Sequence, residues 1–108
     1  MVYIVNDVWY PSNKSREVGA KYIENLKKYP PDPSIGKTLL VLVRPSNNGV
    51  HVIGIGKPEK GKLEENILRS TQSGEEMASI EGFTYELKVY LDYTEAYNAL
   101  NMAPPKEI

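Results

Sequence analysis

Two periodicities in the apolar residues of this chain predict four strands and two main helices. Val2–Trp9 has β-branched and aromatic residues at both odd and even positions, which is typical of a strand covered on both sides. Thr38–Val43 is a continuous apolar run, and Val50–Ile55 returns after a polar turn. The pair Asn48-Gly49 is favoured where both turn residues need a positive φ, so we expect a hairpin here.

Helical spacing occurs in two segments. Ser15 is expected to cap the first helix, which Pro30 and the prolines after it end. The expected inner face of this helix consists of Val18, Tyr22, Ile23, Leu26 and Tyr29. A second helix is expected from Lys62 to Ser79, and a break at Gly74 is left open because glycine is a weak helix former. The expected inner face of the second helix consists of Leu63, Ile67, Leu68 and Met77.

The alternation over Phe83–Leu91 predicts the last strand, with its odd positions toward the helices. Thr84, Glu86, Lys88 and Tyr90 then share the opposite face. A short helix is expected over Thr94–Leu100. Residues 1–103 are predicted to form one domain, and residues 104–108 a loose tail.

The order of these elements, β-α-β-β-α-β, predicts an α+β fold, the ferredoxin-like sandwich with a four-stranded antiparallel sheet. Both helices then lie on one face of the sheet, and the third strand lies between the first two. Three of the strands carry apolar residues on both faces, although only one face is covered. Because a large exposed apolar patch usually marks an interface, we expect a homodimer or higher homo-oligomer, with two sheets packed through their open faces.

This pattern resembles the dimeric α+β barrel superfamily. The resemblance runs over the strand Val2–Trp9, the helix near Arg16–Tyr29, the hairpin around Ser46-Asn47-Asn48-Gly49 and the strand Phe83–Tyr93. It is one of pattern and length. The superfamily includes antibiotic-biosynthesis-type monooxygenases, muconolactone isomerases and small proteins of unknown function, so the resemblance implies a dimeric fold but selects no activity. No catalytic motif of its members maps onto this chain.

Charge and composition limit the kinds of partner and cofactor that we expect for this chain. The 108 residues include 13 basic and 14 acidic side chains, which argues against nucleic acid as the main partner. Cysteine is absent and histidine occurs once, so we expect no disulfide, no metal site and no cofactor. No apolar run approaches the roughly 20 residues that span a bilayer, and residues 1–10 lack the features of a signal peptide. We therefore expect a cytoplasmic protein with no membrane contact.

The segment from Gly56 to Lys62 fits the phosphate-binding pattern G-x-x-x-x-G-K and is expected to be a loop before the second helix. Leu63 replaces the hydroxyl residue that would hold Mg²⁺, and Glu59 adds a negative charge inside the loop. A nucleotide site, weak anion binding by Lys57, Lys60 and Lys62, and a solvated loop are the three interpretations.

The topology predicts a polar cluster at one end of the sheet, formed by Asp7, Trp9, Arg44, His51, Tyr85 and Glu86. His51 can exchange a proton near neutral pH, and Asp7 could orient its ring as a catalytic partner. The alternatives for His51 are a ligand-pocket residue without catalysis and a half-exposed strand residue beside a turn.

Five residues are candidates for contact with a small apolar ligand: Tyr3, Asn6, Trp9, Arg44 and Tyr90. Asn6 and Asp7 are polar groups within an apolar strand, so each needs a hydrogen-bond partner if it is buried. They are expected either to bond across the dimer or to mark a cavity.

Three functions follow from these observations. The first is an uncharacterised homodimeric small-molecule-binding protein. The second is a cofactor-independent monooxygenase or isomerase for an apolar or aromatic small molecule, with His51 and Asp7 handling protons. The third is a regulatory module whose role is oligomerisation.

Overall fold

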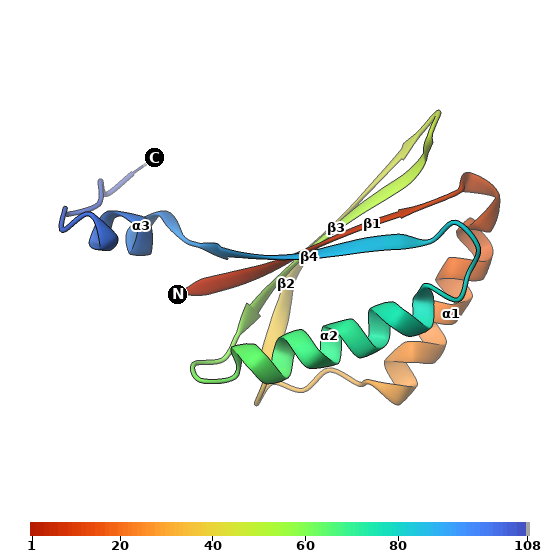
Figure 1. Cartoon of the computed structure of the whole chain (residues 1–108), viewed down its shortest axis with the longest axis horizontal. Helices are drawn as coiled ribbons and strands as arrows, with labels where there is room; N and C mark the ends of the chain where they lie inside the picture. The colour runs from red at the N-terminus through yellow and green to blue at the C-terminus, as the bar shows by residue number, and fades with distance from the viewer. Residues whose placement is uncertain (108) are drawn as a thin grey trace.

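The computed structural model describes residues 1–107 and shows an α+β fold. Its elements are β1 (Val2–Tyr10), a 3₁₀ turn (Ser12–Lys14), α1 (Ser15–Lys28), β2 (Gly36–Ser46), β3 (Gly49–Pro58), α2 (Leu63–Met77), β4 (Thr84–Leu91) and α3 (Tyr93–Ala99). The strands form one open antiparallel sheet in the order β2-β3-β1-β4. α1 and α2 lie on the same side of this sheet (Figure 1). Ile108, the last residue of the predicted tail, lies outside the described residues.

The strand register gives the sheet two distinct faces. Trp9 pairs with His51 and Thr84, and His51 pairs with Arg44, so these four residues form one row. Because side chains alternate along a strand, each strand contributes every second residue to each face. The face toward α1 and α2, the helix face, includes Ile4, Asn6, Val8, Tyr10, Val41, Val43, Val52, Gly54, Gly56 and Tyr85. The opposite face, the open face, includes Val5, Asp7, Trp9, Leu40, Leu42, Arg44, His51, Ile53, Ile55, Glu86 and Lys88.

The buried core lies at one end of the helix face. It consists of Val18, Met77, Ile80 and Phe83, and Val8, Tyr10 and Tyr85 pack against it. Gly74 allows α2 to approach the sheet there, because a Cβ at this position would lie 2.7 Å from the Tyr85 ring. The helix therefore continues through Gly74, where a break had been left open.

The rest of the helix layer covers the sheet poorly. α1 rests on α2 through Asn25, whose Nδ2 donates to the backbone oxygen of Ser73 at 3.2 Å. On the expected inner face of α1, Tyr22 and Leu26 are turned toward the sheet but remain exposed, and Ile23 is exposed away from it. Leu68 of α2 is also exposed, at 59%. Periodicity located the apolar stripe of each helix, but the stripe does not reach the sheet along its whole length.

Several local expectations differ from the structure. Ser15 is the first residue of α1 and does not cap it; its hydroxyl donates to the Ser12 carbonyl at 2.8 Å and closes the 3₁₀ turn. The β2–β3 hairpin turns at Asn47-Asn48, and Gly49 alone of the three has a positive φ, of 112°. Glycine is also needed here for space, since a Cβ on Gly49 would lie 2.6 Å from the Tyr10 carbonyl oxygen.

The end of the chain projects from the domain. The radius of gyration is 15.8 Å, against about 13 Å for a compact domain of this length. α3 extends beyond the end of β4, away from α1 and α2 (Figure 1). Asp92 caps it by accepting from the Glu95 amide at 2.8 Å, and the N-terminal amine pairs with Glu95 at 2.7 Å. Val89 and Leu91 are consequently exposed, although they were expected to pack under the helices.

The close approach of Gly74 to the Tyr85 ring can be tested by mutation. Gly74→Ala should lower the free energy of unfolding by about 1–3 kcal/mol, because the added methyl overlaps the Tyr85 ring. Gly19→Ala is the control, since its Cβ meets nothing within 4 Å and alanine favours a helix by about 1 kcal/mol. Urea unfolding followed by circular dichroism measures both. Equal stabilisation by the two substitutions would contradict this packing.

Candidate functional site

A cavity of about 610 Å³ lies between the helix face of the sheet, α1, α2 and the segment that joins α1 to β2. Apolar residues from both layers form much of its wall, among them Ile4, Val8, Val18, Leu26, Val41 and Val52. Ligand pockets commonly measure about 300–1,000 Å³ and are mainly apolar with a few polar groups. The cavity therefore has the size and lining of a small-molecule site.

Two glycines of β3 help to create this space. Gly54 and Gly56 both face the helices and both line the cavity, so the centre of the sheet carries no side chain there. A Cβ built on Gly54 would meet nothing closer than the Asn6 backbone oxygen at 3.9 Å. The cavity thus continues down to the backbone of β3.

Asn6 projects into the same region from β1. It pairs with Gly54 on one side and Leu87 on the other, and it lines the cavity. Its side-chain oxygen is buried and has no hydrogen-bond partner among residues 1–107. A buried polar atom without a partner costs about 1–3 kcal/mol. Of the five predicted ligand residues, Asn6 is the one that the structure places in this cavity.

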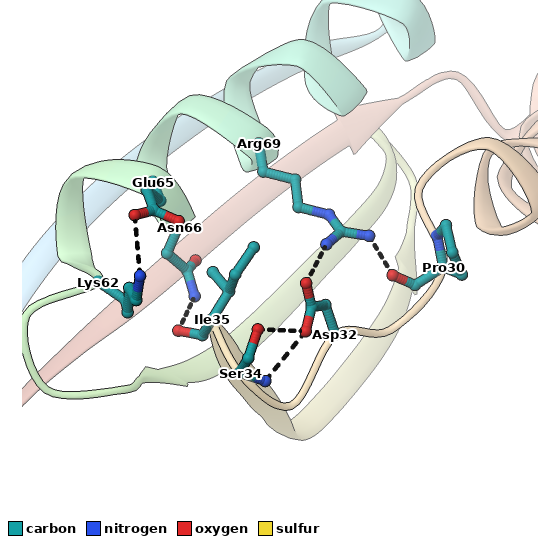
Figure 2. Close-up of polar contacts among 8 residues, drawn as sticks. All are labelled: Pro30, Asp32, Ser34, Ile35, Lys62, Glu65, Asn66 and Arg69. Carbon is teal, nitrogen blue, oxygen red and sulfur yellow. Dashed lines mark hydrogen bonds and ion pairs between the residues drawn. The ribbon is translucent and has the colours of Figure 1, made fainter.

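The segment before β2 closes one side of the cavity and is fastened to α2 (Figure 2). Asp32 accepts hydrogen bonds from the Ser34 hydroxyl at 2.6 Å and the Ser34 amide at 3.0 Å, and pairs with Arg69 at 3.7 Å. Arg69 also donates to the Pro30 carbonyl, and Asn66 donates to the Ile35 carbonyl at 3.5 Å. The Ser34 hydrogen bonds and then the Arg69 charge hold the pKa of Asp32 below its usual value.

Sequence reasoning missed this fastening and the contacts between α1 and α2. Asn25 is buried and binds Ser73, and Glu76 accepts from Lys28 and from the Tyr29 hydroxyl. Hydrogen bonding and charge from Glu76 raise the pKa of Lys28. The only sequence signal for these pairs was their polarity within otherwise amphipathic helices.

A second polar cluster lies on the open face. Asp7 is 6% exposed, and its carboxylate contacts His51 Nε2 at 2.8 Å and Lys88 Nζ at 3.0 Å. The Trp9 and His51 rings are stacked, with centroids 5.0 Å apart. Burial raises the pKa of Asp7, but the hydrogen bonds and charges of Lys88 and His51 outweigh it, so the net shift is downward. The pKa of Lys88 rises because Asp7 accepts its hydrogen bond.

The predicted cluster is brought together in part. Asp7, Trp9, Arg44, His51 and Glu86 lie in two adjacent rows of the open face. Tyr85 faces the helices instead, where its hydroxyl donates to Glu75 at 2.8 Å. Lys88 was not foreseen as a partner of Asp7.

The remaining candidates lie elsewhere on the sheet. Tyr3 pairs with Tyr90. Both are six positions along the strands from the Trp9 row, which corresponds to about 20 Å. Asn6 lies on the face opposite to all of them. Within the described residues, the cavity lining includes none of the predicted site residues Tyr3, Trp9, Arg44, His51 and Tyr90.

The segment from Gly56 to Lys62 is not the loop that was expected. β3 continues to Pro58, and Gly56 pairs with Thr38, so these residues belong to the sheet ladder. The turn is confined to Lys60-Gly61, and Lys62 pairs with Glu65 at 3.1 Å. Gly56 and Lys57 therefore lie in an extended strand rather than in a phosphate-binding turn.

Two searches of the described residues gave negative results. Within residues 1–107, no group of three or more His, Cys, Asp or Glu side chains is placed to hold a metal ion. In the same part of the chain, no helix combines the length and apolar character needed to cross a membrane.

Comparison with known proteins supports the fold alone. No protein-family model matches the chain, and no curated protein matches it in sequence. The solved structure of a protein described as "De novo designed protein Foldit4" is similar, with a TM-score of 0.56 and 17% sequence identity. The match covers 84% of this chain and 97% of the designed one. At this identity the similarity is one of architecture, and it is compatible with a ferredoxin-like fold.

The Asp7 cluster predicts a specific dependence of stability on pH. A carboxyl whose pKa is lowered on folding stabilises the folded state above its unfolded pKa, here near 3.8, and loses that effect as the pH falls through the folded pKa. Asp7→Asn should lower stability at pH 7 and flatten the loss of stability below about pH 4. Thermal unfolding between pH 2 and pH 7 measures this.

Glu86→Gln is the control for this experiment. Glu86 is an exposed carboxylate on the same face, 4.0 Å from Lys88. Glu86→Gln should leave the acid limb of the stability curve, which is the loss of stability below about pH 4, close to that of the natural sequence. The role of Asp7 is refuted if both variants keep the same acid limb as the natural protein.

Proposed function

We propose that this chain is a homodimer of the ferredoxin-like class, as the resemblance to dimeric α+β barrels implies, and that it binds small apolar molecules. The 610 Å³ cavity under the helices is the observation that carries the proposal. Its floor is formed by a glycine-bearing strand, its walls are mainly apolar, and its mouth is fastened by Asp32 and Arg69. A bound molecule would supply the packing that α1 does not give to the sheet.

The open face supports the proposed dimer. A strip of aliphatic side chains crosses three strands at its centre: Val5, Leu40, Leu42, Ile53 and Ile55. Charged residues flank the strip, with Arg44 at one end and Lys88 on the β4 side. An apolar centre with a polar rim is the usual anatomy of a protein interface. Two such sheets stack about 10 Å apart when they pack face to face.

The exposure of β2 favours a ligand and a dimer together. Leu42 is 48% exposed on the open face, and Val43 is 61% exposed on the helix face. A second copy would cover the first residue, and a ligand in the cavity would cover part of the second. One partner alone leaves half of this apolar edge strand in water.

The enzymatic alternative has weaker support. His51 and Asp7 are hydrogen bonded, as a proton-handling pair requires. However, Asp7 is also neutralised by Lys88, and the pair lies on the face opposite the cavity. A substrate in the cavity would be separated from His51 by the sheet. We therefore propose binding rather than catalysis.

Filling the cavity tests the binding proposal. At Gly54 an added Cβ meets nothing closer than 3.9 Å, and valine favours a strand, so Gly54→Val should fold with its side chain in the cavity. The neutral fluorophore N-phenyl-1-naphthylamine should bind the natural protein, and Gly54→Val should weaken binding by about tenfold or more, since the occupied volume is lost. Fluorescence titration measures this, with Gly19→Ala as the control.

Two results would count against this proposal. One is the absence of saturable binding to the natural protein. The other is an equal affinity in Gly54→Val, with circular dichroism showing that the variant is folded.

The dimer is tested by a charge on the open face. Leu42→Lys should convert the dimer to monomers, because it buries an unpaired charge in the interface. Leu68→Lys is the matched control, since Leu68 is also an exposed leucine but lies on α2. Sedimentation equilibrium gives the masses. Monomeric natural protein, or a dimer that survives Leu42→Lys, would contradict the proposed interface.

A further inference from the structure

We propose that the cavity selects a neutral apolar molecule that carries one hydroxyl group, an alcohol or a phenol, and that Asn6 recognises this group. This inference rests on the proposed binding function and adds the chemical class of the ligand. It begins from the buried side-chain oxygen of Asn6, which has no hydrogen-bond partner among residues 1–107.

The sheet around Asn6 provides it with no donor. Its cross-strand neighbours on the helix face are Gly54, which has no side chain, and Leu87, which is apolar. Along β1 the adjacent residues of the same face are Ile4 and Val8. The amide oxygen therefore has no partner within the sheet, and because it is shielded from solvent it meets a ligand only when the amide turns toward the cavity.

Three polar residues of the lining on the neighbouring elements are already engaged. The Tyr85 hydroxyl donates to Glu75 at 2.8 Å. The Asn25 amide donates to Ser73 on α2. Asn66 donates to the Ile35 carbonyl at the mouth. Asn6 differs from both other asparagines of the lining in lacking such a contact.

The charge distribution favours a neutral ligand. Within residues 1–107, the charged residues of the lining are Asp32, Lys37 and Arg69, all in or beside the segment that joins α1 to β2. Asp32 and Arg69 pair with each other, so they do not present a free charge to the interior. Lys37 is exposed at the start of β2. An ion buried beside Ile4 and Val8 would therefore carry a large desolvation cost.

A hydroxyl fits an asparagine amide in either orientation. The amide turns about a soft terminal torsion, so its oxygen or its nitrogen can face the cavity. A hydroxyl both donates and accepts, and it can satisfy whichever atom is presented. A single such group at the Asn6 end, with an apolar body against Val41 and Val52, matches the lining.

Two probes of nearly equal shape test this inference: 2-naphthol and 2-methylnaphthalene. The second replaces the hydroxyl with a methyl group. Calorimetric titration of the full chain gives the ratio of their dissociation constants. Asn6→Leu should shift that ratio by about tenfold against 2-naphthol, because one hydrogen bond to a buried group is lost. Asn13→Leu should leave the ratio unchanged, because Asn13 is exposed in the 3₁₀ turn and does not line the cavity.

The outcomes separate the two proposals. If both probes bind and Asn6→Leu leaves their ratio unchanged, hydroxyl recognition is overturned and the binding function stands. If neither probe binds the natural protein, both fail. Asn6→Leu should unfold at a higher temperature than the natural protein, because it removes a buried atom without a partner. Asn6→Val is the second variant and should shift the ratio in the same direction.

Discussion

The central constraint of the structure is that the sheet is only partly covered. It is apolar on both faces, but α1 and α2 lie on one of them. α2 packs closely at Gly74, where the ring of Tyr85 occupies the place of a side chain. α1 then binds α2 through Asn25 rather than extending across β2. The uncovered part of the helix face becomes the cavity, and the other face remains a candidate interface. The proposed ligand and the proposed second copy would each bury apolar surface that the chain itself leaves exposed.

The neighbours Asn6 and Asp7 show how alternation along one strand creates two different sites. Asp7 faces the side where His51 and Lys88 lie on the flanking strands, so its carboxylate is fully partnered although it is buried. Asn6 faces a glycine and a leucine, so its amide oxygen has no partner within residues 1–107. The first arrangement stabilises the fold. The second costs stability, as binding sites often do before the ligand arrives.

The sequence predicted much of the fold, because strands and helices have different periods. The alternation in Phe83–Leu91 and the apolar run of Val2–Trp9 indicated strands at nearly the observed positions. The expected antiparallel arrangement of the first and third strands put His51 and Asp7 at one end of the sheet, where the structure shows them hydrogen bonded. Periodicity assigns a residue to a face but does not say how closely a helix approaches that face. The exposure of Tyr22 and Ile23 and the continuous helix through Gly74 therefore required the structure.

The candidate site was harder to predict than the fold. Aromatic residues such as Trp9 and Tyr90 suggested a pocket, but the structure places them on the open face and puts the cavity on the other side, beside Gly54 and Gly56. A glycine in a strand signals a close approach or a space only when the opposite layer is known. Asn6 was singled out as a polar residue in an apolar strand, and the structure places it in the lining of the cavity.

The location of binding is the central claim, and backbone amide chemical shifts of the labelled protein titrated with 2-naphthol test it most directly. We expect the largest shifts at Asn6, Gly54 and Gly56, which lie on the cavity wall. Shifts centred on Trp9, His51 and Arg44, with none at Gly54, would place the ligand on the open face and contradict the account.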